Sequence, residues 1–349
     1  MLVPILLFAV GLVLLIKGGD WFVDGATGIA RRFHLPEILI GATVVSIGTT
    51  LPEVMVSAQG AIAGSGSMAY GNAIGSIICN TSLIAAITIA IKPGKADRKS
   101  MIIPICFFFG AAAFYMTIAY TTGDFSRWVG IVLLATFIAY MLLTVLQMKK
   151  NPTLAVAEGE EEEEAEESAM SDEEYAQLSG GKKALAHILG KRNTIVRELV
   201  LLVIGAAVIA FGANLLVDNG TIIAEKLGVP ETVIALTFVA LGTSLPELVT
   251  AITSLAKGHG ALSLGNIIGA NLFNLVLVSG VAVTISPFPV PNASQLFGHN
   301  ASLVMDLPVM LGVMLILTIP ALIRQKLSRV QGIALLCIYA AFCTVQFVM

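Results

Sequence analysis

Long runs of apolar residues alternate with short polar stretches along the whole chain. A helix needs about 20 apolar residues to cross a hydrocarbon core roughly 30 Å thick. Ten runs reach that length, near residues 2–29, 36–62, 69–91, 101–120, 128–148, 195–224, 230–255, 261–286, 301–323 and 330–348. The pattern predicts an all-α polytopic membrane protein with ten transmembrane helices.

Composition agrees with that prediction and excludes a soluble domain. Of 349 residues, 56% belong to the hydrophobic set and 12% are charged, and the mean hydropathy is +0.89. The four cysteines lie in apolar stretches without metal-ligand or CxxC spacing, so we interpret them as buried apolar residues; they are Cys79, Cys106, Cys337 and Cys343. The apolar start at Leu2 has no basic leader and predicts a retained first helix.

The polar segment 149–194 divides the chain into two halves. It lacks a sustained apolar period and contains the run Glu160 to Glu164, so we expect an acidic linker that is largely disordered. Eleven of the 23 acidic residues lie between Glu158 and Glu174, and the net charge of -3 therefore describes this linker more than the membrane part. Regulation by calcium is an alternative role for it.

The two halves are copies of each other. A shift of 194 residues lays LPEILIGATVVSIGTTLPE, from Leu35 to Glu53, over VPETVIALTFVALGTSLPE, from Val229 to Glu247. The same shift lays GNAIGSIICN, which ends at Asn80, over GNIIGANLFN, which ends at Asn274. The sequence thus predicts a first five-helix repeat over 1–148 and a second over 195–349.

Five spans per repeat is an odd number, so the second repeat must enter the membrane from the opposite side. Inverted repeats of this kind let a central site face either side in turn. If the loops alternate between the two sides, 17 of the 20 Lys and Arg residues lie on the side of the linker, and only Arg127 and Lys226 lie opposite. The positive-inside tendency then makes the linker cytoplasmic and puts both termini outside a plasma membrane.

Each repeat carries a Gly-Thr-x-Leu-Pro-Glu sequence in the middle of a span. Pro52 and Pro246 cannot donate a hydrogen bond to the carbonyl four residues back, which predicts broken helices. Glu53 and Glu247 follow directly, at a depth where an ionised carboxylate costs at least about 2.5 kcal/mol and is seldom found without a function. The pair predicts one shared cation site at the midplane.

Neutral oxygen donors accompany both carboxylates. Hydroxyls recur at helical spacing around each glutamate: Thr43, Ser46, Thr49, Thr50 and Ser57 in the first copy, and Thr237, Thr243 and Ser244 in the second. The neighbouring spans supply Asn72, Ser76, Asn80, Asn266 and Asn274, and glycines that allow close helix approach, Gly71, Gly75, Gly265 and Gly269. For Asn72 and Asn266, structural hydrogen bonding between helices is an equally good interpretation.

The absence of His and Cys from this stripe favours a hard cation such as sodium, calcium or magnesium. Calcium takes six to eight oxygens in a flexible shell, whereas magnesium prefers a small octahedron and loses water reluctantly. Calcium is therefore favoured over magnesium. No cofactor is expected, since the cations are cargo.

At these residues the chain resembles the calcium/cation antiporter superfamily, and within it the prokaryotic sodium/calcium exchangers. The resemblance rests on GTTLPE with GNAIGSIICN and on GTSLPE with GNIIGANLFN, in alpha motifs over 41–80 and 235–274. It implies that Glu53 and Glu247 bind calcium together with the carbonyls of Thr49 and Thr243. It also implies a set of further ligands, mainly for sodium: hydroxyls of Thr49, Thr50, Ser76, Thr243 and Ser244, carbonyls of Ser46 and Ala240, and Asn80.

Two residues depart from the family motif. Ala270 stands where the motif has Ser, and Asn274, a further candidate ligand, stands where some relatives have an acid. Both departures remove oxygen donors or charge from one end of the site. They bear on the number of sodium ions that the site holds.

Secondary active exchange of calcium for sodium is the function that the sequence favours. Alternatives are a proton/calcium exchanger, because two protons can also neutralise two carboxylates, and a cation channel with an acidic pore. An intramembrane enzyme has little support, since the stripe lacks a nucleophile/base pair. The expected partners are calcium, sodium and the lipid bilayer, without nucleic acid or an obligate protein partner.

Polar residues at the span ends receive simpler interpretations. Glu37 follows a proline at a span start, where a carboxylate offsets the helix dipole. Lys17, Asp20 and Asp24 predict an ion pair at the membrane edge of the first span. Asp306 has no counterpart in the first copy and receives no role.

Overall fold

The computed structural model describes residues 2–33, 35–150, 195–226, 244–292 and 295–348, and helices dominate them. Nine helical stretches of these residues are long and apolar enough to cross a membrane. Nine of the ten predicted spans are thereby confirmed. The tenth, 230–255, falls partly outside the described residues, and its described part forms most of the shorter apolar helix α13 (Leu245–Ala256).

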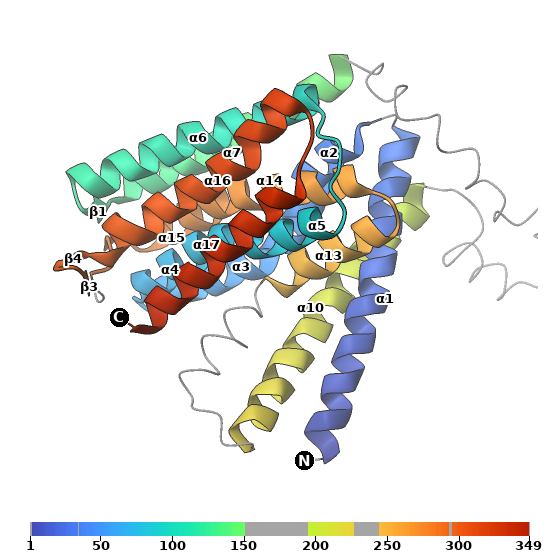
Figure 1. Cartoon of the computed structure of the whole chain (residues 1–349), viewed down its shortest axis with the longest axis horizontal. Helices are drawn as coiled ribbons and strands as arrows, with labels where there is room; N and C mark the ends of the chain where they lie inside the picture. Colours follow the sequence, from blue (N-terminus) through green and yellow to red (C-terminus); the bar gives the residue numbers. More distant parts are fainter. Residues whose placement is uncertain (1, 34, 151–194, 227–243, 293–294, 349) are drawn as a thin grey trace, which may run out of the picture.

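The first half contains five of these stretches (Figure 1). The first, fourth and fifth are single helices: α1 (Leu2–Arg32), α6 (Arg98–Thr121) and α7 (Arg127–Lys150). The second and third are each a helix with a π-helical segment inside it. They comprise α2 (Glu37–Ile40), η1 (Gly41–Val45) and α3 (Ser46–Ile62), then α4 (Gly66–Cys79), η2 (Asn80–Ala85) and α5 (Ala86–Ile91).

The second half repeats the scheme as far as it is described. It begins with α10 (Ile195–Lys226) and resumes with α13. The remaining stretches are α14 (Gly260–Phe273), η7 (Asn274–Val278) and α15 (Ser279–Ile285), then η8 (Ser302–Asp306) with α16 (Leu307–Arg324), and finally α17 (Arg329–Val348).

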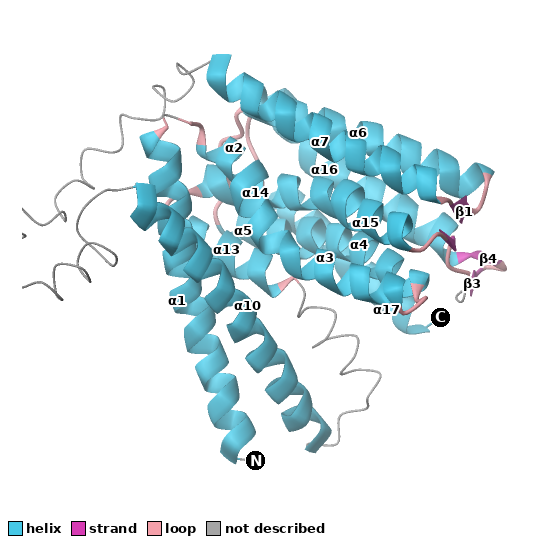
Figure 2. Cartoon of the chain, turned by 180° about the vertical axis from the view of Figure 1, so that it is seen from behind, coloured by secondary structure: helices cyan, strands magenta, loops and turns pink. Residues whose placement is uncertain are grey.

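Four two-residue strands lie at one end of the bundle (Figure 2). β1 (Asp124–Phe125) pairs antiparallel with β2 (Phe288–Pro289), which joins the α6–α7 turn to the segment after α15. β3 (Gln295–Leu296) pairs with β4 (His299–Asn300) in a hairpin. These strands close loops and leave the architecture helical.

The predicted break at Pro52 takes a different form from the one expected. The chain remains helical from Glu37 to Ile62, and Pro52 lies inside α3. The departure from α-helical geometry is the π-helical segment η1, which ends seven residues before the proline. Pro246 lies in the first turn of α13 and starts a helix, as an N-terminal proline can do at no hydrogen-bond cost.

The first helices of the two halves, α1 and α10, run side by side in opposite directions and lean away from the other helices (Figures 1 and 2). Glycines bring the backbones together. A Cβ on Gly11 would lie 2.9 Å from the Gly212 carbonyl oxygen, and one on Gly205 would lie 2.9 Å from that of Gly18. The antiparallel pair is the geometry that inverted repeats require.

Many large apolar side chains of the outer helices are exposed, whereas many polar residues of the spans are buried. On α7, for example, Leu142 is 60% exposed, whereas Thr144 is fully buried. The stretch Gly260–Ile285, which comprises α14, η7 and α15, is the most buried of the nine, with 83% of its most apolar part buried. Apolar side chains outside and polar side chains inside are the reverse of the arrangement in soluble proteins. This is expected when lipid surrounds the helices, and it identifies a multi-pass membrane protein.

Candidate ion-binding site

Glu53 and Glu247 lie buried at the centre of the bundle, and both are fully shielded from solvent. Glu53 comes from the middle of α3, and Glu247 from the first turn of α13. The two carboxyl groups are close enough to repel each other when both are charged. None of their four oxygens has a hydrogen-bond partner among the described residues. Buried charges without partners are strongly unfavourable, so the arrangement calls for a cation.

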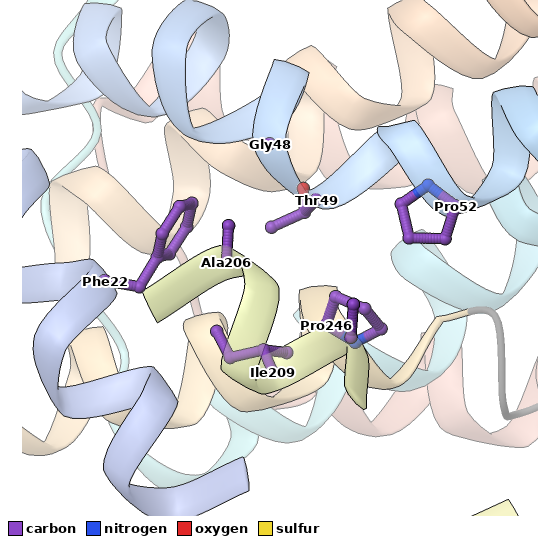
Figure 3. A pocket seen from close by; sticks show the side chains of 8 residues that line it. Phe22, Gly48, Thr49, Pro52, Ala206, Ile209 and Pro246 are labelled. Carbon is purple, nitrogen blue, oxygen red and sulfur yellow. The ribbon is translucent and has the colours of Figure 1, made fainter. Parts of the chain in front are cut away.

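The two prolines that precede these glutamates line one small cavity. Figure 3 shows Thr49 and Pro52 on one segment, with Pro246 on a segment that faces them. The cavity measures about 10 Å³, room for about one water, and its wall is otherwise mostly apolar. Because Pro52 has no N–H, the Gly48 carbonyl loses its usual helical donor. A backbone oxygen is thus available one turn before Glu53.

The hydroxyls around the two glutamates differ in whether they have hydrogen-bond partners. The Thr49 hydroxyl lies beside Glu247 and donates to Asn266 Oδ1 at 3.3 Å. The Ser46 hydroxyl is occupied by the carbonyls of Gly41 (2.7 Å) and Asn266 (3.0 Å). In contrast, Thr50 Oγ1 and Ser244 Oγ are buried and lack a partner in the described part of the chain. These two hydroxyls could accept an ion without breaking a described hydrogen bond.

Asn80 and Asn274 complete a pseudo-symmetric donor set. Each is fully buried, begins a π-helical segment, and has both amide atoms without a partner within the described ranges. The segments cross over, since η2 packs on α13 and η7 packs on α3. Each glutamate-bearing helix therefore contacts the asparagine-bearing segment of the other half. π-helical turns occur frequently at functional sites.

The other two asparagines differ from each other. Asn72 donates to the Glu53 carbonyl at 3.1 Å and to Ser57 Oγ at 2.8 Å, which ties α4 to α3 and supports the structural interpretation. Asn266 accepts from Ser46 and Thr49, and its Nδ2 atom has no described partner. Asn72 thus holds the Glu53 backbone in place, whereas Asn266 orients two hydroxyls of the first repeat.

The remaining predicted ligands fall into two groups. Ala240 and Thr243 lie outside the described residues. Ser76 in α4 is 5% exposed, and Ala270 in α14 is fully buried. Nine of the predicted oxygen-bearing residues are buried in the spans that carry the glutamates or in the spans that pack on them. They are Ser46, Thr49, Thr50, Glu53, Ser76, Asn80, Ser244, Glu247 and Asn274.

Among the buried polar residues that sequence reasoning missed are three on α13 and α14. Thr250 and Ser254 on α13 and Asn271 on α14 are fully buried, and each has a side-chain atom without a partner among the residues described. Asn271 also donates to Thr81 Oγ1 at 2.7 Å. For Thr250 and Ser254 the signal was present, because they follow Glu247 at helical spacings of three and seven.

Charged residues gather where α13 ends. Lys257 Nζ lies 2.7 Å from Asp24 Oδ1 and 3.5 Å from Asp20 Oδ1, and the predicted Lys17–Asp20 pair is present at 3.8 Å. Glu37 lies in the first turn of α2, as predicted. Its carboxylate also contacts His259 Nδ1 at 2.6 Å, a partner that helix capping does not require. Asp306 accepts from Gln346 Nε2 at 3.0 Å.

The donor set suits a hard cation. Two carboxylates lie among hydroxyls, amides and backbone carbonyls, and the described part of the chain has no group of three or more His, Cys, Asp and Glu side chains that could hold a metal ion. Oxygen ligands of mixed charge and flexible count match calcium and sodium better than zinc or copper. The site can hold one divalent cation neutralised by two glutamates, or monovalent cations on the neutral oxygens.

Comparison with known proteins identifies relatives over nearly the whole chain. The family model described as sodium/calcium exchanger protein matches residues 3–146 and 197–348. The sodium/calcium exchanger MaX1 of Methanosarcina acetivorans is 29% identical over 99% of both chains. An uncharacterised membrane protein of Methanocaldococcus jannaschii is 32% identical over 95% of this chain and 94% of its own.

Solved structures agree in fold. A structure of the sodium-calcium exchanger NCX_Mj superposes with a TM-score of 0.74 at 31% identity, over 97% of both chains. The match covers nearly the whole chain, including both halves and the helices that carry Glu53 and Glu247. On the extent of these matches, this chain is a multi-pass membrane protein that belongs to the sodium/calcium exchanger family.

Proposed function

We propose that the protein is a secondary active antiporter that exchanges calcium for sodium at a midplane site between Glu53 and Glu247. The observation that carries the proposal is the pair of fully buried carboxylates, one from each half, whose oxygens lack described hydrogen-bond partners. A divalent cation compensates both charges at once. Relatives named as sodium/calcium exchangers support the choice of ions.

Ligand roles follow from donor chemistry. Calcium binds the two glutamates with the carbonyls of Thr49 and Thr243. Sodium uses the neutral donors, namely the hydroxyls of Thr49, Thr50, Ser76, Thr243 and Ser244 and the carbonyls of Ser46 and Ala240. Asn80 and Asn274 supply amide oxygens next to the glutamates. The ions are cargo, and the proposal needs no cofactor and no protein partner.

Alternating access follows from the inverted arrangement. The antiparallel α1–α10 pair contacts the other helices mainly through α13 and the α2–α3 stretch, so it can move relative to the core without breaking the central site. We place the linker 149–194 in the cytoplasm and both termini outside the plasma membrane, because the basic residues cluster on the linker side.

The decisive experiment measures calcium uptake by reconstituted vesicles against sodium, potassium and proton gradients in turn. Uptake driven by a sodium gradient at clamped pH is expected. Uptake that follows the proton gradient alone would favour the proton/calcium alternative, and flux without any counter-ion would indicate a channel.

Ala270→Ser is expected to lower the sodium concentration that drives or competes with calcium flux, and Ser76→Ala to raise it. Residues 76 and 270 are equivalent under the 194-residue shift, and a hydroxyl gives a hard cation one more oxygen than a methyl group does. The measurement is the sodium dependence of calcium flux. If Ala270→Ser coincides with the parent while Ser76→Ala shifts strongly, position 270 is unused and a proton becomes the better counter-ion.

Deletion of about 158–180 is expected to leave exchange intact, because this acidic segment lacks an apolar face and both repeats are complete without it. The segment lies outside the described residues, and the expectation rests on the sequence. Flux per folded protein is the measurement. Loss of flux in a deletion variant that purifies as well as the parent would make the segment part of the transport mechanism.

A further inference from the structure

Beyond Glu247, helix α13 carries two further oxygens on the same face. Thr250 and Ser254 follow Glu247 by three and seven residues, and at 3.6 residues per turn the three side chains lie within about one sixth of the helix circumference. With a rise of about 1.5 Å per residue, Ser254 lies roughly 10 Å along the helix from Glu247. The three residues form a line from the central site toward the end of α13.

Neither hydroxyl has a hydrogen-bond partner in the described part of the chain, which is unusual for buried Ser and Thr in helices. Buried Ser and Thr residues in helices normally donate to the carbonyl four residues back. Thr81 does so to Ile77 at 2.8 Å, Thr43 to Leu39 at 2.7 Å and Thr318 to Met314 at 2.6 Å. Thr250 and Ser254 are equally buried, yet neither hydroxyl finds a partner among the described residues.

Their surroundings do not explain them as packing residues. Ala251, on the same face, belongs to an apolar cluster with Ile84 and Ile268. The opposite side of α13 contacts α1, where Val249 and Thr253 lie next to Gly19. A buried hydroxyl without a partner in such apolar surroundings destabilises the fold, and an aliphatic residue would pack better there. Packing in this structure therefore does not explain why residues 250 and 254 carry hydroxyl groups.

The internal duplication does not account for Thr250 and Ser254 either. Under the 194-residue shift, Thr250 corresponds to Val56 and Ser254 to Gly60. The first copy instead has Ser57, whose hydroxyl accepts from Asn72. The first repeat therefore has no equivalent of the Thr250 and Ser254 hydroxyls, which lie between Glu247 and the C-terminal end of α13.

That end carries charge at the surface of the bundle. Asp20 and Asp24 of α1 pair there with Lys257, and Glu37 of α2 contacts His259 two residues further along the chain. Because Glu247 marks the inner end of the line and these carboxylates mark the outer end, Thr250 and Ser254 span the apolar interval between two cation-attracting regions.

We propose that Thr250 and Ser254 form a second, transient sodium-binding station on the route between the central site and the surface at the α13 end. Neutral hydroxyls suit a partly dehydrated monovalent cation, whereas calcium would lack carboxylates there. In this structure neither hydroxyl has a partner among the described residues. When this side opens, the hydroxyls replace water around the passing ion. The inference rests on the proposed exchange function and assigns a path to it.

The test compares Thr250→Val, Ser254→Ala and the double variant with the parent in vesicles of known protein orientation. We expect the half-saturating sodium concentration to rise at least about fivefold on the α13-end side and to stay unchanged on the other side. Thr250→Ser keeps the hydroxyl and should behave like the parent. Thr253→Val is the matched control, because it changes the α1-facing side of the same helix.

The proposed sodium station is wrong if the Thr250→Val and Ser254→Ala variants leave the sodium dependence unchanged on both sides of the membrane. It is also wrong if they shift it equally on both sides. Purified variants are compared by melting temperature with and without sodium, and if the double variant does not fold, the single variants decide the question. A parent protein that shows no sodium dependence at all would refute the exchange function itself, which separates the two failures.

Discussion

Replacing Glu53 or Glu247 with glutamine is expected to abolish calcium transport, with a loss of at least about 100-fold. Glutamine keeps the size of the side chain but removes half of the charge that balances a divalent ion. At an effective dielectric constant of about 20, a unit charge 4 Å from another contributes about 4 kcal/mol, and a divalent ion doubles the effect. Calcium uptake by vesicles is the measurement, with calcium-dependent thermal stabilisation as a second readout.

Asp306→Asn is the matched control. Asp306 also lies in a spanning stretch, but its carboxylate accepts from Gln346 and has no place in the proposed site. This variant should transport calcium as the parent does. Normal transport by both glutamine variants would refute the assignment of the site, whatever the control shows.

Gly265→Ala is expected to cost about 3 kcal/mol or more of stability and to prevent assembly of the site. A Cβ at position 265 would overlap the carbonyl oxygen of Ile38, and one at Gly41 would overlap that of Leu262. Backbone atoms of α2 and α14 cannot retreat as a flexible side chain could. Because Ser46, the first residue of α3, donates to the carbonyl of Asn266 next to Gly265, the same change should displace the hydroxyls around Glu53.

The melting temperature and the yield of monodisperse protein measure this effect. Gly110→Ala is the control, since Gly110 lies exposed in the middle of α6 and no described atom comes within 4 Å of its added Cβ. The close-packing account is wrong if Gly265→Ala melts within a few degrees of the parent and transports normally.

Sequence was sufficient for the architecture because lipid imposes simple rules. Length and apolarity of each run predicted the spans, and the duplicated GTTLPE and GTSLPE motifs brought the two glutamates together from positions 194 residues apart. The inverted order followed from an odd span count. Each of these steps depends on a constraint that acts along the chain.

Contacts between distant segments could not be predicted in the same way. The predicted close approach holds for Gly265 and Gly269, which are buried against the α2–η1 stretch, whereas Gly71 is exposed and Gly75 half-buried. The partnership of Glu37 with His259 depends on how α2 and α14 meet, which no local pattern encodes. The π-helical turn at Gly41–Val45 likewise replaced the break that proline chemistry predicted at Pro52.

The interface between α1 and α10 is self-complementary. Under the 194-residue shift, Gly11 maps onto Gly205 and Gly18 onto Gly212, so the approach of Gly11 to Gly212 maps onto that of Gly205 to Gly18. A twofold homodimer has contacts of this isologous kind. A single five-helix ancestor that inserted in both orientations would have formed the same interface with a second copy of itself. Fusion of two such genes then required only a connecting segment, because five spans end on the side where the inverted copy begins.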